Sequence, residues 1–312
     1  MKAIVAHRYG PPETLRPEEV EKPAVEPDQV LVRVRASSVN PYDWHMLRGS
    51  PFLVRLSGGL LKPKNGALGV DAAGVVEAVG ADVTHVAPGD EVFGARNGAF
   101  AEYVSGKNFV PKPARISFEQ AGTLGIAGIT ALQAVRDKGR VKAGQKVLVN
   151  GAAGGVGTFA VQIAKALGAD VTGVCSTRNV DLVRSIGAER VVDYTVADYT
   201  REGQRYDVIV DCIGNHRLLA NRRALTADGT LVIVGGPLRR LPAVLVLPLI
   251  VRQRIGFFIA KINRDDLSVL ADLMESGQVT PVIDRAYPLS EVPEAIAYLE
   301  EGHARGKVVI TV

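Results

Sequence analysis

Cysteine is scarce in this sequence: Cys175 and Cys212 are its two cysteines among 312 residues. A disulfide framework therefore cannot organise the fold, and nothing indicates an oxidising compartment. The apolar part of the N-terminal segment Met1–Arg8 is too short for a signal peptide and is typical of a first β-strand. We therefore expect a cytoplasmic protein.

Long apolar runs and an excess of one charge are also missing. The sequence has 37 lysines and arginines against 33 aspartates and glutamates, and the small excess is dispersed, so a nucleic-acid-binding face is not indicated. The longest apolar run, Leu241–Val251, includes Pro242 and Pro248 and is too short to span a bilayer. It could form a contact between subunits, a lid over a substrate, or a patch that touches a membrane. We favour subunit contact or burial.

A strand, a glycine turn and a helix follow one another near the middle of the chain. The apolar run at 147–149 ends in glycines, and apolar residues then recur at helical spacing through 156–167. Gly154 and Gly157 fit the last two glycines of the dinucleotide-binding fingerprint, with Ala152 in place of the first. Gly154 would let the backbone approach a pyrophosphate, and Gly157 would let the helix pack closely on the strand. The alternative interpretation is a tight turn without a ligand.

Further strands and helices alternate after this turn. A helix is expected at 179–186, and β-branched runs predict strands at 170–175, 190–193, 206–211 and 230–234. Glycines close the last two of these strands at Gly214, Gly235 and Gly236. Parallel strands that alternate with helices predict an α/β fold with a doubly wound parallel sheet.

The two ends of the chain have different patterns. About the first 120 residues contain short β-type runs separated by glycine and proline, which predicts a mainly β domain. The C-terminal part is expected to form a helix at 264–277, a strand at 282–287, a helix at 290–301 that begins at Ser290, and a strand at 307–312. A chain of this length can form two domains.

Several motifs occur in one order along nearly the whole chain. They are Val39-Asn-Pro-Tyr-Asp-Trp44, the glycine-containing segments 68–80 and 86–94, and the segments 99–103, 127–131, 151–157 and 302–309. Together they resemble the medium-chain dehydrogenase/reductase family, and within it the zinc-free quinone oxidoreductases and the reticulon-interacting NADPH oxidoreductases. The resemblance implies a GroES-like catalytic domain at 1–121, completed by 263–312, and a Rossmann NADPH-binding domain at 122–262.

The residues that would hold zinc are replaced. Zinc-containing members of the family use a cysteine in the loop after the first strands and a glycine–histidine–glutamate segment. Here Asn40–Asp43 and Gly69–Asp71 stand in those places. Catalytic zinc needs three well-placed Cys, His or carboxylate ligands, and the histidines show no paired spacing, although His45 lies near Asp43. We therefore predict that no metal is bound.

Ser176, Thr177 and Arg178 follow the second strand of the nucleotide fold, where an NAD-preferring protein would carry a carboxylate. Two hydroxyls and a guanidinium can donate hydrogen bonds to a 2′-phosphate, so NADPH is the predicted cofactor. In the alternative interpretation, Ser176 or Thr177 is a helix N-cap and Arg178 is a solvated surface charge. The resemblance also implies that Tyr194 lies near the same phosphate.

The other cofactor contacts follow from the glycine turn and the resemblance. The predicted pyrophosphate contacts are Gly154, Gly155, Val156 and Gly157. The resemblance adds Thr130 and Asn40 near the nicotinamide, Gly214 beneath the adenosine half, Gly235 and Gly236 near the nicotinamide ribose, Phe258, Ile259 and Ala260 along the carboxamide edge, and Arg305 at the phosphates. Arg305 could instead be a solvated charge before the last strand.

A quinone or an α,β-unsaturated carbonyl that accepts hydride develops negative charge on its oxygen, so a hydrogen-bond donor is needed. Tyr42 and Asn40 are the predicted donors, although Tyr42 could instead pack its ring in the core with its hydroxyl on a backbone carbonyl. Apolar residues that could line the acceptor pocket are Trp44, Phe52, Leu53 and Leu56. Residues 57–68 are typical of a loop that covers such a pocket.

These features predict a zinc-independent, NADPH-dependent oxidoreductase that transfers hydride to a quinone or an α,β-unsaturated carbonyl and acts as a homodimer. Two alternatives stay open. One is an NADPH-binding sensor or partner-binding protein with little turnover, and the other is a zinc-type alcohol dehydrogenase.

Overall fold

The computed structural model describes residues 1–64, 66–236 and 251–312. The chain divides into two compact units: Met1–Ala127, Ile262–Glu275 and Pro281–Val312 form the first, and Gly128–Lys261 and Ser276–Thr280 form the second. The domain boundaries predicted from the sequence are at 121 and 262. Except for Val251, the apolar run Leu241–Val251 lies outside the described residues.

The first unit is organised around a seven-stranded sheet in the order β14-β15-β3-β4-β5-β7, with β6 paired to β3. Strand β15 (Lys307–Thr311) runs antiparallel to β3 (Val30–Val39), and Val308 lies opposite Val39. The last strand of the chain therefore reaches the end of β3. The remaining strands of the unit, including the separate pair β1 and β2, are β1 (Lys2–Val5), β2 (Arg16–Glu19), β4 (Asp71–Val79), β5 (Glu91–Ala95), β6 (Tyr103–Gly106), β7 (Phe109–Pro111) and β14 (Ile283–Pro288).

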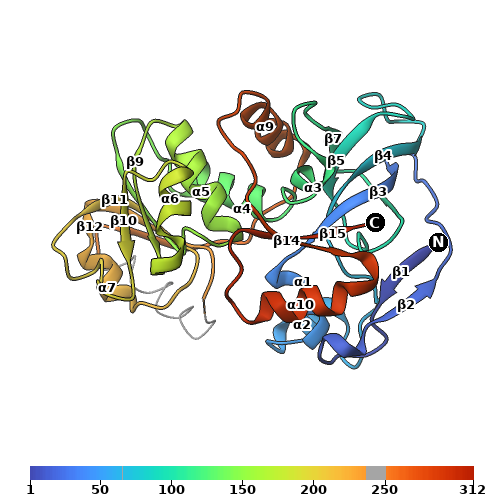
Figure 1. Cartoon of the computed structure of the whole chain (residues 1–312), viewed down its shortest axis with the longest axis horizontal. Coiled ribbons are helices and arrows are strands. Elements are labelled where there is room, and N and C mark those ends of the chain that lie inside the picture. The colour runs from blue at the N-terminus through green and yellow to red at the C-terminus, as the bar shows by residue number, and fades with distance from the viewer. Residues whose placement is uncertain (65, 237–250) are drawn as a thin grey trace. The chain divides into compact units, whose positions relative to one another are not determined.

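Helices from both ends of the sequence lie together in the first unit. Helix α1 (Pro41–Arg48) packs beside α10 (Val292–Glu300), as Figure 1 shows in blue and red. Arg48 donates two hydrogen bonds to the Glu300 carboxylate, at 2.5 and 2.7 Å. The other helical segments of this unit are η1 (Pro12–Thr14), α2 (Leu53–Gly58), α3 (Phe118–Ala121), α9 (Arg264–Glu275) and η6 (Leu289–Glu291).

The start of α10 differs from the prediction. Ser290 lies inside the short 3₁₀ segment η6, and α10 begins at Val292 with Glu291 as its N-cap. Proline is favoured in the first turn of a helix because its missing N–H would be unpaired there anyway. Pro293 therefore sets the start of the helix, and the predicted start at Ser290 is wrong.

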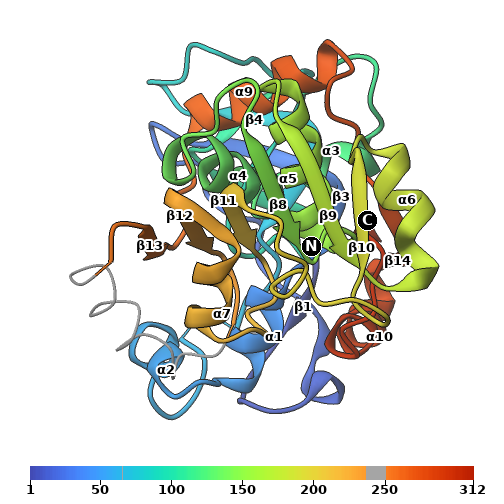
Figure 2. The same cartoon turned by 90° about the vertical axis from the view of Figure 1, so that its left-hand side faces the viewer.

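The second unit contains a six-stranded parallel sheet in the order β10-β9-β8-β11-β12-β13 (Figure 2). The strand order changes direction between β8 and β11, which is where ligands bind in sheets of this type. The strands are β8 (Lys146–Asn150), β9 (Asp170–Cys175), β10 (Arg190–Asp193), β11 (Tyr206–Asp211), β12 (Leu225–Ile233) and β13 (Arg254–Phe257). The predicted α/β class with a doubly wound parallel sheet is confirmed.

Burial on both faces explains why these strands are continuous apolar runs. Val147, Leu148 and Val149 of β8 are fully buried, as expected where helices cover both faces of a parallel sheet. The helical segments of the second unit are α4 (Ala127–Leu132), the π-helical η2 (Gln133–Lys138), α5 (Gly155–Ala166), η3 (Thr177–Asn179), α6 (Val180–Ser185) and α7 (Leu218–Arg223). Among the helices of the described residues, none has the length and apolar character needed to cross a membrane.

Candidate active site

The glycine turn between β8 and α5 is shaped by its backbone. Gly151 has a left-handed conformation with φ of 86°, and α5 starts directly after its N-cap, Gly154. A Cβ atom at Gly157 would lie 2.0 Å from the carbonyl oxygen of Gly151, so packing requires glycine there. A Cβ atom at Gly154 would have that same oxygen as its nearest neighbour, at 3.4 Å. Gly154 therefore leaves space beside the N–H groups of a helix start, which suits an anion such as a pyrophosphate.

A buried carboxylate supports this turn from the neighbouring strand. Asp211, at the end of β11, accepts hydrogen bonds at 2.8 Å from the Asn150 side chain and from the backbone N–H of Gly214. Asn221 adds a longer contact at 3.3 Å. These bonds hold Gly214 in a left-handed conformation with φ of 69°. Gly214 is among the residues predicted from the sequence and Asp211 is not, although an aspartate at a strand end before a glycine is a recognisable turn signal.

A second carboxylate, that of Asp193 in β10, lies beside the end of β9, next to the residues that are predicted to bind the 2′-phosphate. The Thr177 hydroxyl donates to Asp193 at 2.5 Å, and Thr195 donates its backbone N–H to the same carboxylate at 2.9 Å. These hydrogen bonds, that of Thr177 first, hold the pKa of Asp193 below its ordinary value. Asp193 is not among the residues predicted from the sequence, because it belongs to β10 and reaches this place only through the pairing of β10 with Cys175 of β9.

The other residues that are predicted to bind the 2′-phosphate lie at or near the surface. Ser176 occupies the N-cap position of η3, but its side chain accepts no backbone N–H there; its hydroxyl oxygen instead accepts from the Asn179 side chain at 3.3 Å. Arg178 is exposed, and Tyr194 is 57% exposed. Their contact with a 2′-phosphate stays a prediction.

The predicted carboxamide-binding segment is anchored at its end by Gln133, a side chain that is not among the predicted site residues. The Gln133 amide donates to the Lys261 carbonyl oxygen at 2.7 Å and accepts from the Lys261 N–H at 3.0 Å. Ile259, two residues earlier, is 84% exposed. Gln133 directly follows α4, which carries the half-buried Thr130. The roles of Thr130 and of Phe258–Ala260 stay predictions.

Glycine is required by packing after β12 as well. A Cβ atom at Gly235 would lie 2.5 Å from the carbonyl oxygen of Cys212, and Gly236 has φ of 126°. Both positions follow the end of a strand that neighbours β11. Their predicted contact with the nicotinamide ribose is untested, but the close backbone approach explains why no side chain is found there.

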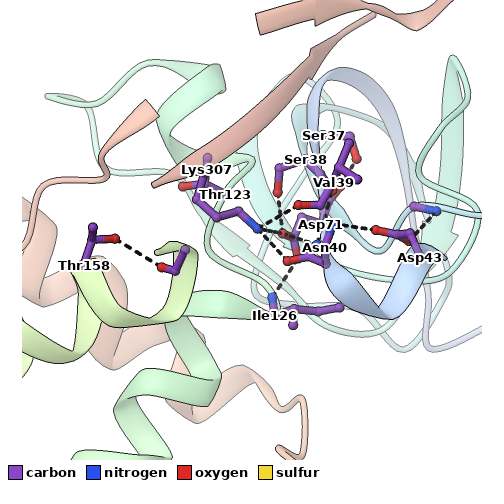
Figure 3. A network of polar contacts seen from close by, with 12 residues as sticks. Ser37, Ser38, Val39, Asn40, Asp43, Asp71, Thr123, Ile126, Thr158 and Lys307 are labelled. Atoms are coloured by element: carbon purple, nitrogen blue, oxygen red, sulfur yellow. Dashed lines mark hydrogen bonds and ion pairs between the residues drawn. The ribbon is translucent and has the colours of Figure 1, made fainter. Parts of the chain in front are cut away.

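In the first unit, Asn40 lies at the transition from β3 to α1, and it is 2% exposed. Its side-chain nitrogen donates to Asp71 at 3.0 Å and to the Ser38 carbonyl oxygen at 3.3 Å, and its side-chain oxygen accepts from Lys307 at 2.5 Å (Figure 3). Both N–H bonds of the amide are therefore engaged inside the protein. This network disfavours Asn40 as the donor to an acceptor's oxygen, a role that stays untested.

Asp71 is the centre of this buried network. Its Oδ2 accepts the Ser38 hydroxyl at 2.6 Å and lies 3.3 Å from the Lys307 ammonium, while its Oδ1 accepts the Ile126 N–H at 2.7 Å. The side chains of Asp71 and Lys307 are 0% and 3% exposed. Buried charges of opposite sign need this pairing and these hydrogen bonds to offset the loss of water. Lys307 is predicted from the sequence only as the start of the last strand.

Asp43 fixes the start of α1. Its carboxylate accepts the backbone N–H of Asn40 at 2.8 Å and that of Gly69 at 3.1 Å. Burial raises the pKa of Asp43 to about 7, and the nearby Asp71 adds to the rise, while the two N–H groups and Lys307 oppose it. Residues Asn40–Asp43 thus open a helix with a capping box, where a loop was expected from zinc-containing family members.

Tyr42, in the first turn of α1, is 40% exposed. Its hydroxyl accepts a long hydrogen bond from the Asn97 side chain at 3.5 Å, so the alternative of a core tyrosine bonded to a backbone carbonyl is not what the structure has. Trp44 packs against the core of the first unit. Phe52, Leu53 and Leu56 are exposed. Their predicted place in an acceptor pocket is untested.

Two further predictions concern Arg305 and metals. Arg305 is exposed, and its backbone N–H donates to Asp284 at 2.9 Å; its phosphate contact stays a prediction. Within residues 1–64, 66–236 and 251–312, no group of three or more His, Cys, Asp or Glu side chains is placed to hold a metal ion. Independence from zinc stays a prediction from the residues.

Comparison with known proteins identifies the family. Residues 26–114 match the model for an alcohol dehydrogenase GroES-like domain, and residues 186–310 match that for a zinc-binding dehydrogenase. The mouse protein named "NAD(P)H oxidoreductase RTN4IP1, mitochondrial" is 35% identical over 100% of this chain and 89% of its own length. The chain belongs to the medium-chain dehydrogenase/reductase family. The resemblance seen in the sequence is thereby confirmed.

Two other proteins similar to this chain are also named as oxidoreductases. An Arabidopsis thaliana protein named "NADPH-dependent alkenal/one oxidoreductase, chloroplastic" is 35% identical over 99% of this chain and 79% of its own length. The solved structure of the quinone oxidoreductase from Coxiella burnetii is 33% identical, has a TM-score of 0.89, and aligns over 100% of this chain and 99% of its own.

Proposed function

We propose that this family member is an NADPH-dependent oxidoreductase that transfers hydride to a quinone or an α,β-unsaturated carbonyl without a metal. The observation that carries the proposal is the turn at Gly154, where a helix start and open space meet at the switch point of the parallel sheet. The names of the Arabidopsis and Coxiella proteins support an enone and a quinone as acceptor classes.

The residues of the second unit fit a dinucleotide. Gly154–Gly157 and the start of α5 would hold the pyrophosphate, and Gly214 with its support from Asp211 would lie beneath the adenosine half. Ser176 and Arg178 would bind the 2′-phosphate, while the ionised Asp193 opposes it. When bound, NADPH supplies the hydride.

In the proposed mechanism, Tyr42 donates a hydrogen bond to the acceptor's oxygen as negative charge develops there. Its exposed hydroxyl supports this role. A positioned donor of this kind is worth roughly 10²–10³ in rate in related oxyanion sites. Asn40 takes a supporting role, because its two N–H bonds are already used by Asp71 and Ser38.

Turnover after metal removal tests the proposal. Purified protein treated with a chelator should oxidise NADPH in the presence of a panel of quinones and enones. Tight NADPH binding without turnover on any acceptor would instead favour the sensor or partner-binding alternative. Loss of activity on chelation with one bound zinc per chain would favour the alcohol dehydrogenase alternative.

We also propose a homodimer. Strand β13 ends the order of the sheet in the second unit, and the described part of the chain pairs it on one side, with β12. Phe257, the last residue of β13, is 38% exposed, and Ile259, two residues beyond the strand, is 84% exposed; an exposed strand edge can pair with a second copy. Analytical ultracentrifugation should give twice the chain mass, and Ile259→Asp should shift it to the monomer.

The proposed location is the cytoplasm. Both cysteines are free, and Cys175 is buried, which fits a reducing compartment. The mouse and Arabidopsis proteins carry "mitochondrial" and "chloroplastic" in their names. Cell fractionation with an antibody to this chain would decide between the cytoplasm and an organelle.

A further inference from the structure

We propose that Lys307 is a positioning residue for the reaction: its buried ammonium fixes the Asn40 side chain and, through it, the first turn of α1 that carries Tyr42. The inference rests on the proposed role of Tyr42 as a hydrogen-bond donor. Lys307 belongs to β15 and is 267 positions from Asn40 in the sequence. The contact exists because β15 pairs with β3.

The ammonium group has three acceptors around it. Its nitrogen lies 2.5 Å from the Asn40 side-chain oxygen, 3.3 Å from Asp71 Oδ2 and 3.4 Å from the Val39 carbonyl oxygen. An ammonium has three N–H donors, so these contacts match its capacity. The ammonium therefore binds Asn40 and Asp71. These residues belong to the two segments that stand where zinc-containing members of the family have their ligands.

Opposite charges hold the two ends of the Asn40 amide. The ammonium of Lys307 binds the amide oxygen, and the carboxylate of Asp71 binds the amide nitrogen (Figure 3). A rotation of the amide by half a turn would place N–H against ammonium and oxygen against carboxylate, and both contacts would be repulsive. The pair Lys307 and Asp71 therefore fixes one orientation of Asn40.

The position of the Asn40 side chain also affects Tyr42, which follows it by two residues. The backbone N–H of Asn40 is bound by Asp43, and Asn40 is the N-cap of α1, so its position defines where the first turn begins. Tyr42 lies in that turn with its hydroxyl at the surface. A buried network beneath an exposed donor is the arrangement that holds a reacting group in place before the substrate arrives.

The experiment compares Lys307→Met, which removes the ammonium, with Lys307→Arg, which keeps the charge. Lys112→Met is the matched control, because Lys112 is a second lysine of the first unit with a 4% exposed side chain and a carboxylate partner, Glu91. We expect Lys307→Met to lower kcat by about 10- to 100-fold, the loss expected when a reacting group moves by about 1 Å. Lys307→Arg should retain most of the activity, and Lys112→Met should stay within about twofold of the parent protein.

Two readouts separate positioning from general damage. The KM for NADPH should change less than twofold in Lys307→Met, because the proposed cofactor contacts of the second unit are intact. In a Tyr42→Phe background, Lys307→Met should cause little further loss of kcat, because both changes remove the same positioned hydroxyl. If Lys307→Met does not fold, the pair Lys307→Met/Asp71→Asn removes both charges and is tested in its place.

Several outcomes would overturn the inference. They are full kcat in Lys307→Met, an equal loss in Lys112→Met, or losses that multiply in the Tyr42→Phe background. A protein without turnover on any quinone or enone would contradict the proposed function instead. In that case a crystal structure of Lys307→Met decides the positioning: Asn40 and Tyr42 displaced would support it, and both in their original places would refute it.

Discussion

The two polar sites of this protein are built in opposite ways. In the second unit, the glycine turn offers backbone N–H groups and empty space, and the residues around Thr177 lie near the surface. In the first unit, the network around Asp71 is buried, and its two charged side chains, Asp71 and Lys307, have each other and the Asn40 amide as partners. This difference predicts different effects of substitutions at the two sites. Substitutions near Thr177 should change ligand affinity. Substitutions around Asp71 should also change the stability of the fold.

Replacing Asp71 tests the buried side of this comparison and has the largest expected effect. Asp71→Ala leaves the Lys307 ammonium buried without its carboxylate, which should lower the free energy of unfolding by about 3–5 kcal/mol. Urea unfolding followed by fluorescence of Trp44, the single tryptophan of the sequence, reports on the first unit. Glu77→Ala is the control, because the Lys22–Glu77 pair is solvent-exposed and should change stability little. Equal small losses in both variants would contradict the idea that Lys307 depends on its carboxylate.

The same comparison explains what the sequence could predict. The fingerprint at Gly154 and Gly157 lies within one stretch of chain, and the strands at 170–175, 190–193 and 206–211 have the predicted bounds. These features depend on local patterns of apolar residues and glycine. The network in the first unit joins Asn40 to Asp71 and Lys307, at separations of 31 and 267 residues, and no local pattern reveals such a contact.

Asp193 illustrates the same limit in the second unit. The prediction for Ser176, Thr177 and Arg178 considered the residues that follow β9 along the chain. The carboxylate of Asp193 comes from the next strand and is bound to Thr177 through the parallel register of β9 and β10. A site at the end of a parallel sheet contains residues from several neighbouring strands. The residues that follow a single strand are therefore only part of the site.

Two glycines of one turn sharpen the comparison by separating packing from ligand binding. Gly157→Ala places a Cβ atom 2.0 Å from a backbone oxygen, and we expect a loss of about 3 kcal/mol in stability, at the upper end for overpacking. Gly154→Ala has its nearest atom at 3.4 Å, so the fold should be retained. NADPH affinity should then fall by at least about tenfold, or about 1.4 kcal/mol. Thermal unfolding and fluorescence titration measure the two effects; unchanged NADPH affinity in Gly154→Ala would contradict a pyrophosphate at this turn.

Arg178 tests the exposed side of the comparison. Arg178→Ala should weaken NADPH binding by about 10- to 30-fold, because a charge-assisted hydrogen bond is worth about 1.5–2 kcal/mol. NADH binding should change less than twofold, since NADH has no 2′-phosphate. Isothermal titration with both nucleotides measures the difference, and Arg201→Ala, another exposed arginine of the second unit, serves as the control. Equal losses for NADH and NADPH would remove the case for a phosphate contact at Arg178.

Asp43 provides the most graded test, because its effect changes continuously with pH. Its pKa is raised from 3.8 to about 7 in the folded protein, by burial first. Between about pH 4 and pH 7 the folded state therefore binds a proton that the unfolded state has lost, so stability falls as pH rises, by at most about 1.4 kcal/mol per pH unit. Above about pH 7 both states are ionised at this position, and this contribution becomes constant.

Asp43→Asn should remove this slope. The variant also loses one acceptor for the N–H groups of Asn40 and Gly69, but that loss is the same at every pH, so it shifts the whole stability curve without tilting it. Urea unfolding of both proteins at pH 5, 6, 7 and 8, followed by Trp44 fluorescence, gives the unfolding free energy of the parent protein minus that of Asp43→Asn. We expect that difference to fall up to about pH 7 and then to level off. A constant difference from pH 5 to pH 8 would mean that the two backbone N–H groups keep the buried carboxylate ionised throughout, and the start of α1 would then be held by charge at every pH.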